Sequence, residues 1–246
     1  MSELPELVVA MRHAESERNK AAAAARKGDL SLHLATIQTH DHLCSITERG
    51  KRQAKSAQDW LAKKKLHFDK IIHSPIQRVP ETLTEVFGSY WKGDVDHRLM
   101  ERRLGSPLEN MLHVDRLKLA ATDSRFSASV DDAFNYSPPG GNSFATMLEE
   151  TKDFFESLKN CDAHAVFLGT HSMRMRIIRM FVENQTPDQM IEHIDDFEHG
   201  FQNCEMYFMS RVSPFDDNQT FPNYQFVRRV NPYDESRTTG WRQLLY

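Results

Sequence analysis

Near its start the chain carries the stretch Leu7-Val8-Val9-Ala10-Met11-Arg12-His13, in which five apolar residues lead directly into an arginine and a histidine. A short apolar run that stops at charged residues is typical of a buried β-strand that ends in a polar loop. Phe68–His73 and Ala163–Gly169 have the same form, and they are followed by Ser74-Pro75 and Thr170-His171. We therefore predict three strands that carry polar residues at their carboxyl ends.

Helical patterns separate these strands. Thr47 and Ser143 are good N-caps, and apolar residues at helical spacing predict helices over residues 48–65, 79–87, 144–158, 173–181 and 190–197. Residues 95–99 predict a further strand, and residues 204–212 with 224–230 predict a hairpin at a sheet edge. Strands that alternate with helices and are apolar on both faces indicate an α/β fold, a three-layer α/β/α sandwich with a mainly parallel central sheet.

Length and composition indicate one globular domain over residues 1–246. Hydrophobic residues make up 39% of the chain, and 31 basic against 35 acidic residues give a net charge of −4, which does not favour nucleic acid or an anionic membrane as a partner. No apolar run approaches the roughly 20 residues of a membrane-spanning helix. Without a basic leader at the start and with three scattered cysteines, we expect a cytoplasmic protein without disulfides.

The ends of the predicted strands gather positive and titratable groups. Arg12 and His13 follow the first strand, Arg78 lies just after the second, and His171 follows the third. Ligands of open parallel sheets bind beyond the carboxyl ends of the strands, where helix N-termini also offer free N–H groups. We therefore expect two guanidinium groups and two imidazoles to meet at one anion-binding site.

These residue types suit phosphoryl chemistry. Guanidinium groups hold phosphoryl oxygens through paired hydrogen bonds, and a neutral imidazole is a nucleophile at pH 7. The arginines and helix ends supply the positive charge that a metal brings elsewhere, so neither a metal nor a cofactor is expected. A leaving alkoxide needs a proton, which calls for a carboxyl group, but periodicity does not select one among the 35 acidic residues.

Five segments carry more specific motifs. They are Arg12-His13-Ala14-Glu15-Ser16 with Asn19, Thr47-Glu48-Arg49-Gly50-Lys51-Arg52-Gln53-Ala54, Ser74-Pro75-Ile76-Gln77-Arg78 with Thr82, Leu99-Met100-Glu101 with Gly105, and His171-Ser172-Met173-Arg174-Met175-Arg176. In this order they resemble the motifs of the histidine phosphatase superfamily, which includes cofactor-dependent phosphoglycerate mutases and many phosphatases. The resemblance implies the same three-layer, phosphoglycerate mutase-like fold.

The resemblance also implies a role for each matching residue. His13 would be the nucleophile that becomes a phosphohistidine, and Glu101 would donate a proton and later activate water. Arg12, Arg78 and His171 would hold the phosphoryl oxygens. Asn19 would line the same pocket, and Ser172 would offer its backbone N–H to phosphate. The expected activity is hydrolysis of a small phosphomonoester without a metal, with inorganic phosphate as a product.

The chain departs from the family pattern at three positions. Ala14 and Ser172 stand where the family has glycine, and Asn142 stands in a Gly-Asn-Ser segment where many members have Gly-Glu-Ser. The segments 20–45 and 105–136 match no motif. We expect them to be insertions that cover the site and determine the substrate. The sequence leaves open both the identity of the substrate and the oligomeric state of the protein.

Parts of the sequence also fit functions other than phosphatase activity. A phosphoglycerate mutase-type transfer is the main alternative, because Arg102 and Arg103 could bind a second anion, although a solvated basic turn is the simpler interpretation. A phosphate-binding module without catalysis is a further one. A metal hydrolase would need ligands such as His40-Asp41-His42 or the segment from Glu192-His193 to Glu198-His199, and both are equally typical of a solvated surface.

Overall fold

The computed structural model describes residues 3–105, 108–123, 126, 132–192, 194, 200–216 and 219–245. In this part of the chain seven strands form one sheet with the order β3-β2-β4-β1-β5-β6-β7. Their bounds are β1 Leu7–Arg12, β2 Lys70–His73, β3 Asp94–Val95, β4 Ala165–Thr170, β5 Met206–Ser210, β6 Phe226–Val230 and β7 Arg242–Gln243. β3, β2, β4 and β1 are parallel, whereas β5, β6 and β7 are antiparallel to their neighbours. The sheet is therefore mixed, with the three predicted apolar strands in its parallel half.

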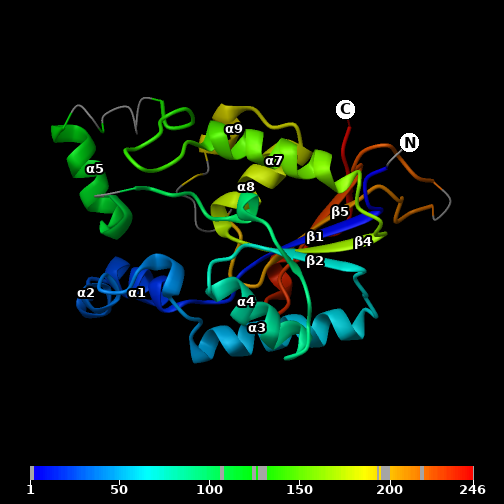
Figure 1. Cartoon of the computed structure of the whole chain (residues 1–246), viewed down its shortest axis with the longest axis horizontal. Helices are drawn as coiled ribbons and strands as arrows, with labels where there is room; N and C mark the ends of the chain where they lie inside the picture. Colours follow the sequence, from blue (N-terminus) through cyan, green and yellow to red (C-terminus); the bar gives the residue numbers. More distant parts are fainter. Residues whose placement is uncertain are drawn as a thin grey trace.

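Helices cover both faces of the sheet. α7 (Phe144–Leu158) and α8 (Ser172–Val182) lie on one face, and α3 (Glu48–Lys63) and α4 (Arg78–Phe87) lie on the other (Figure 1). α9 (Pro187–Glu192) lies on the α7 side of the sheet (Figure 1). This arrangement confirms the three-layer α/β/α prediction.

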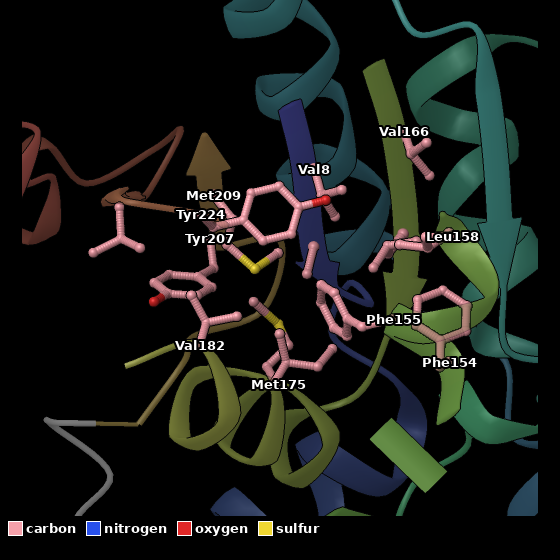
Figure 2. Packing of buried hydrophobic residues seen from close by; sticks show 14 of the residues in the cluster. Val8, Phe154, Phe155, Leu158, Val166, Met175, Val182, Tyr207, Met209 and Tyr224 are labelled. Atoms are coloured by element: carbon pink, nitrogen blue, oxygen red, sulfur yellow. The ribbon is translucent and has the colours of Figure 1, made fainter. Parts of the chain in front are cut away.

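Alternation along the strands explains why two layers of helices are needed. Val8 and Ala10 of β1 belong to the apolar core under α7 and α8, and Val9 and Met11 belong to the core against α3 and α4. Successive side chains of a strand point to opposite faces, so a strand that is apolar at every position must be covered twice. Figure 2 shows part of the first core, to which Val8 of β1, Phe155 of α7 and Met175 of α8 all belong.

Caps position the helices as the sequence predicts. The side chain of Thr47 accepts a hydrogen bond from Gly50 N, and that of Ser143 accepts one from Thr146 N. Each bond satisfies one of the backbone donors that a helix start leaves open. Pro80 is the third residue of α4, where no intrahelical N–H bond is lost.

Three predicted elements differ from the structure. The strand expected over residues 95–99 is a two-residue edge strand, β3, followed by a 3₁₀ turn at His97–Leu99. The hairpin of β5 and β6 does not form the sheet edge, because β5 pairs with β1 and β7 adds beyond β6. The helix expected over residues 190–197 corresponds to α9, which ends at Glu192, and the expected segment from Glu192-His193 to Glu198-His199 falls mostly outside the described residues.

Two segments project past the carboxyl end of β1 (Figure 1). The first holds α1 (Glu17–Arg26), α2 (Ser31–Thr36) and the 3₁₀ turn Asp41–Leu43, and the described part of the second holds the turn Leu108–Asn110 and α5 (His113–Thr122). Arg18 joins them, since its guanidinium donates to the carbonyl oxygen of Glu109 at 3.0 Å and to Asn110 Oδ1 at 2.9 Å. The described parts of the segments 20–45 and 105–136 thus lie at the end of the sheet where Arg12 and His13 emerge.

Candidate active site

His13 lies immediately after β1 and is fixed by backbone bonds. Its N–H donates to Thr170 O of the neighbouring strand at 2.9 Å, and its side chain is 3% exposed. Nδ1 lies 2.7 Å from Ala14 O, an acceptor only, so Nδ1 carries the proton in this contact. Nε2 is then the unprotonated nitrogen, and it accepts a hydrogen bond from Arg78 Nε at 3.1 Å. The nitrogen with the free electron pair therefore faces a guanidinium group.

Arg78 is the first residue of α4 and is almost fully buried. Thr82, one turn later, ties it to the nucleophile loop: the Thr82 hydroxyl donates to Arg78 O at 2.6 Å and accepts from Ala14 N at 3.0 Å. This single hydroxyl fixes the start of α4 relative to the residue after His13. Ala14, where the family has glycine, still offers its N–H, but to Thr82.

His171 lies at the N-cap of α8 and is fully buried. Its ring centroid is 5.1 Å from that of His13, at an angle of 61°. Nε2 hydrogen-bonds with the Ser74 hydroxyl at 2.8 Å, whereas Nδ1 has no hydrogen-bond partner among the described residues. Arg12 Nε likewise has no hydrogen-bond partner among the described residues, although Nη1 of the same guanidinium donates to Phe201 O at 2.7 Å. Two buried ring or guanidinium nitrogens are thus unused by the fold.

The two imidazoles are held in their neutral form. Burial and the charges of Arg78 and Arg12 lower the pKa of His13 well below its usual value, with the bond to Ala14 O acting weakly in the other direction. The pKa of His171 is lowered well below its usual value by burial first and by Arg78 next. Protonating either ring would place another cation beside the guanidinium groups, so both stay uncharged at neutral pH.

The Glu101 carboxylate contacts the start of α8. Its Oε1 accepts from Arg102 N at 2.9 Å and from Met173 N at 3.2 Å. It also lines a pocket of about 200 Å³ and is close enough to Arg12 to raise the pKa of that guanidinium against the larger effect of burial. No hydrogen bond joins Glu101 to His13 within the described part of the chain.

Asn19 and Ser172 occupy supporting positions. Asn19 Oδ1 accepts from Ser16 N at 3.3 Å, which completes the cap of α1, and from Asn203 Nδ2 at 3.1 Å. Asn203 Nδ2 also donates to His13 O at 2.9 Å, so Asn19 reaches the nucleophile through Asn203. Ser172 is the first residue of α8, next to His171.

Asn142 has a structural role that the family pattern does not suggest. Its Oδ1 accepts from Arg103 N at 2.9 Å, and its N–H donates to Arg103 O at 3.0 Å. Arg102 Nε donates to Asn142 O at 3.1 Å, and the Arg102 guanidinium lies over the Phe144 ring. The amide thus fastens the loop after Glu101 to the start of α7. The solvated-turn interpretation is therefore wrong for Arg102, which is held by its neighbours, while Arg103 is exposed.

Asp41 is the residue that sequence reasoning missed. Its carboxylate contacts both terminal nitrogens of Arg78, with Oδ2 at 3.2 Å from Nη1 and 3.1 Å from Nη2. Only 17% of its side chain is exposed, so the solvated-surface interpretation of His40-Asp41-His42 is wrong for its central residue. The contact joins residues 37 positions apart, and no local pattern signals it. Asn203 was missed for the same reason.

The described residues contain neither a metal-binding cluster nor a membrane-spanning helix. No group of three or more His, Cys, Asp or Glu side chains is arranged to hold a metal ion in the described ranges. Among the helices that the structure describes, each is too short or too polar to cross a membrane.

Comparison with known proteins gives one family match and several similar folds. A family model described as "Histidine phosphatase superfamily (branch 1)" matches residues 8–211. A search of curated proteins finds no match. Among solved structures, a mycobacterial glucosyl-3-phosphoglycerate phosphatase in complex with VO3 is similar, with a TM-score of 0.61 and 17% identity over 83% of this chain and 92% of that chain.

Two more solved structures have similar scores. The alpha-ribazole phosphatase from Shigella flexneri has a TM-score of 0.62 and 16% identity, over 88% of this chain and 96% of that one. The mycobacterial phosphatase in complex with inorganic phosphate has a TM-score of 0.61 and 16% identity, over 98% and 96%. At such low identity these likenesses show the fold, and the match of the family model over most of the sequence shows the family. The chain belongs to the histidine phosphatase superfamily.

Proposed function

We propose that this protein is a phosphatase that hydrolyses a small phosphomonoester through a phosphohistidine on His13, without a metal. The observation that carries the proposal is the state of His13. The Nδ1–H group of His13 donates a hydrogen bond to Ala14 O, and the pKa of the imidazole is lowered. Nε2 is therefore a neutral nucleophile beside Arg78. A neutral nitrogen next to guanidinium groups suits attack on a phosphoryl dianion.

In the first step His13 Nε2 attacks phosphorus, and the bond between phosphorus and the ester oxygen breaks. Arg12, Arg78 and His171 hold the three non-bridging oxygens. Arg12 Nε and His171 Nδ1 suit this role, because both are buried and unused by the fold. The leaving oxygen takes a proton from the Glu101 carboxyl group and departs as an alcohol.

In the second step water replaces the alcohol. The Glu101 carboxylate takes a proton from the water, whose oxygen attacks phosphorus while the P–N bond to His13 breaks. Inorganic phosphate leaves, and His13 and Glu101 return to their starting forms. The backbone N–H groups of Arg102 and Met173 hold the Glu101 carboxylate in place at the start of α8.

A mutase remains the second candidate. It needs a site for a further anionic group of its substrate, and Arg102 and Arg103 were the residues that could provide it. The Arg102 guanidinium already donates to Asn142 O and Tyr136 O and stacks on Phe144, and burial lowers the pKa of Arg102 to about 10. Of the two arginines, this leaves only the exposed Arg103 to bind a second anion. Because the mutase would need a firmer second site, hydrolysis is the better supported activity.

Other chemistries have less support. Burial raises the pKa of the Cys44 and Cys204 thiols, which disfavours the reactive thiolate. A phosphate-binding module without catalysis would not need the neutral, oriented imidazole of His13.

We propose further that the chain acts as one domain, in which the segments 20–45 and 105–136 cover the site and select the substrate. Arg18 supports this, since it links the two segments to each other and to Asp41 beside Arg78. A cytoplasmic location agrees with the sequence. The similar solved proteins with vanadate or phosphate bound make a phosphorylated metabolite a reasonable first choice of substrate.

The test uses an aryl phosphate and a panel of phosphorylated metabolites, with wild type and His13→Ala. A phosphatase releases inorganic phosphate in the wild type and not in the variant. Isomerisation of a phosphoglycerate that requires a bisphosphate primer would indicate the mutase instead. Phosphate binding without turnover of any substrate would favour the non-catalytic module.

A further inference from the structure

Arg78, which the proposed function uses to hold the phosphoryl group, is already occupied. A guanidinium group has five N–H bonds. Nε–H bonds to His13 Nε2, the two Nη1 hydrogens reach Asp41 O at 2.9 Å and Asp41 Oδ2 at 3.2 Å, and one Nη2 hydrogen reaches the same Oδ2 at 3.1 Å. Among the contacts of the described residues, one N–H bond of Arg78 is left. A paired contact with two phosphoryl oxygens therefore requires Asp41 to give up its place.

The Asp41 carboxylate is held from two sides. Oδ2 contacts Arg78, and Oδ1 lies 3.3 Å from Arg18 Nε. Arg18 in turn bonds to Glu109 O and Asn110 Oδ1 of the other covering segment. Asp41 thus links the two covering segments to the arginine beside the nucleophile.

The same contacts cover His13. His13 and Arg78 are only 3% and 5% exposed, and Arg78 Nε–H points at the electron pair of His13 Nε2. While Asp41 holds Arg78 in this place, the nucleophile has a guanidinium group against it in the position that phosphorus must reach. Displacement of Asp41 would free Arg78 to turn toward the oxygens of an incoming anion.

We propose that Asp41 is an internal competitor of the phosphoryl group for Arg78, and so sets how strongly the site discriminates among anions. An incoming ligand must exchange a charge-assisted carboxylate contact for its own. A phosphomonoester dianion brings more charge than the carboxylate it displaces, whereas a singly charged anion does not. The inference rests on the proposed role of Arg78 and adds a residue that selects doubly charged phosphomonoesters.

The test is binding of inorganic phosphate, measured by calorimetry, to wild type, Asp41→Asn and Asp41→Ala. Asp29→Asn is the matched control, because it removes the same charge from the same segment and its carboxylate bonds to Ser31 instead. Loss of one charge-assisted competitor is expected to tighten phosphate binding about tenfold in both Asp41 variants. The control should bind as the wild type does.

Hydrolysis of an aryl phosphate gives the second readout. If Asp41 is a competitor, its removal lowers KM and leaves kcat nearly unchanged. If its carboxylate positions Arg78 for catalysis, its removal lowers kcat. Phosphate binding that is unchanged or weaker in both Asp41 variants would overturn the inference. Calorimetry needs no turnover, so the two proposals can fail separately. If the wild type hydrolyses no substrate but Asp41→Asn binds phosphate more tightly than the wild type does, the phosphatase proposal is refuted and this inference stands.

Discussion

The hydroxyl of Thr82 offers a sharp test of how the site is assembled. Thr82→Val keeps the size and branching of the side chain and removes only the hydroxyl. That group accepts from Ala14 N at 3.0 Å and donates to Arg78 O at 2.6 Å, in surroundings where Ala14 is 0% and Thr82 is 1% exposed. The variant leaves a buried N–H without a partner and places a methyl group against a carbonyl oxygen.

The cost follows from these two groups. An unsatisfied buried polar group costs about 1–3 kcal/mol, so Thr82→Val should lower the free energy of unfolding by about 2–3 kcal/mol. Denaturant titration gives this value, with Thr84→Val as the control. Thr84 is on the same helix, and its hydroxyl donates to Pro80 O and accepts from Trp91 Nε1, but both contacts are exposed to water, so its loss should cost roughly 0.5 kcal/mol.

The same substitution should also affect the reaction. Ala14 follows the nucleophile and Arg78 begins α4, so a loosened joint between them moves both groups relative to each other. We expect kcat/KM for an aryl phosphate to fall about tenfold or more, while Thr84→Val stays near wild type. Equal stability losses in the two variants would show that the Thr82 hydroxyl does not join the two elements.

Three further predictions use other parts of the site. Gly50→Ala should destabilise the protein by about 1–3 kcal/mol, although alanine normally favours a helix, because the new Cβ would collide with Glu15 O; thermal and denaturant unfolding measure this. The acid limb of the kcat/KM profile should lie below pH ~6.5, since a lowered His13 pKa keeps Nε2 unprotonated as the pH falls; a limb above that value would contradict the assigned environment. Asn142→Ala should reduce kcat more than it raises KM for an aryl phosphate, because the loop that carries Glu101 loses its bond from Arg103 N, and Asn142→Asp should restore part of the rate.

The sequence predicted the parallel half of the sheet and its helices because their signals are local. β1 and β4 each contain an apolar run, Leu7–Met11 and Ala165–Leu168, and Thr47 and Ser143 cap the helices that follow them. The strand predicted over residues 95–99 overlaps β3 only at Val95, because both residues of β3 are exposed at the sheet edge and no apolar run marks its bounds. The predicted hairpin of β5 and β6 forms, but its predicted place at the sheet edge was wrong, because β7 adds to β6 from residues farther along the chain.

The candidate site followed from the rule that strand ends share one edge of a parallel sheet. That rule predicts that His13, Arg78 and His171 meet, and the structure places them in contact. It could not find Asp41 or Asn203, because each reaches the site from a loop with no periodic pattern. The stacking of Arg102 on Phe144 likewise depends on a contact across 42 positions of sequence, and charge alone made that residue look solvated.

The most direct test of the central claim is to trap the covalent intermediate. Wild-type protein is mixed briefly with an aryl phosphate, quenched under alkaline conditions that preserve phosphohistidine, digested and analysed by mass spectrometry. The phosphoryl group should be on the peptide that contains His13 and should be absent after His13→Asn. Turnover in the wild type with no phosphorylated histidine, or with the phosphoryl group on His171, would contradict the account.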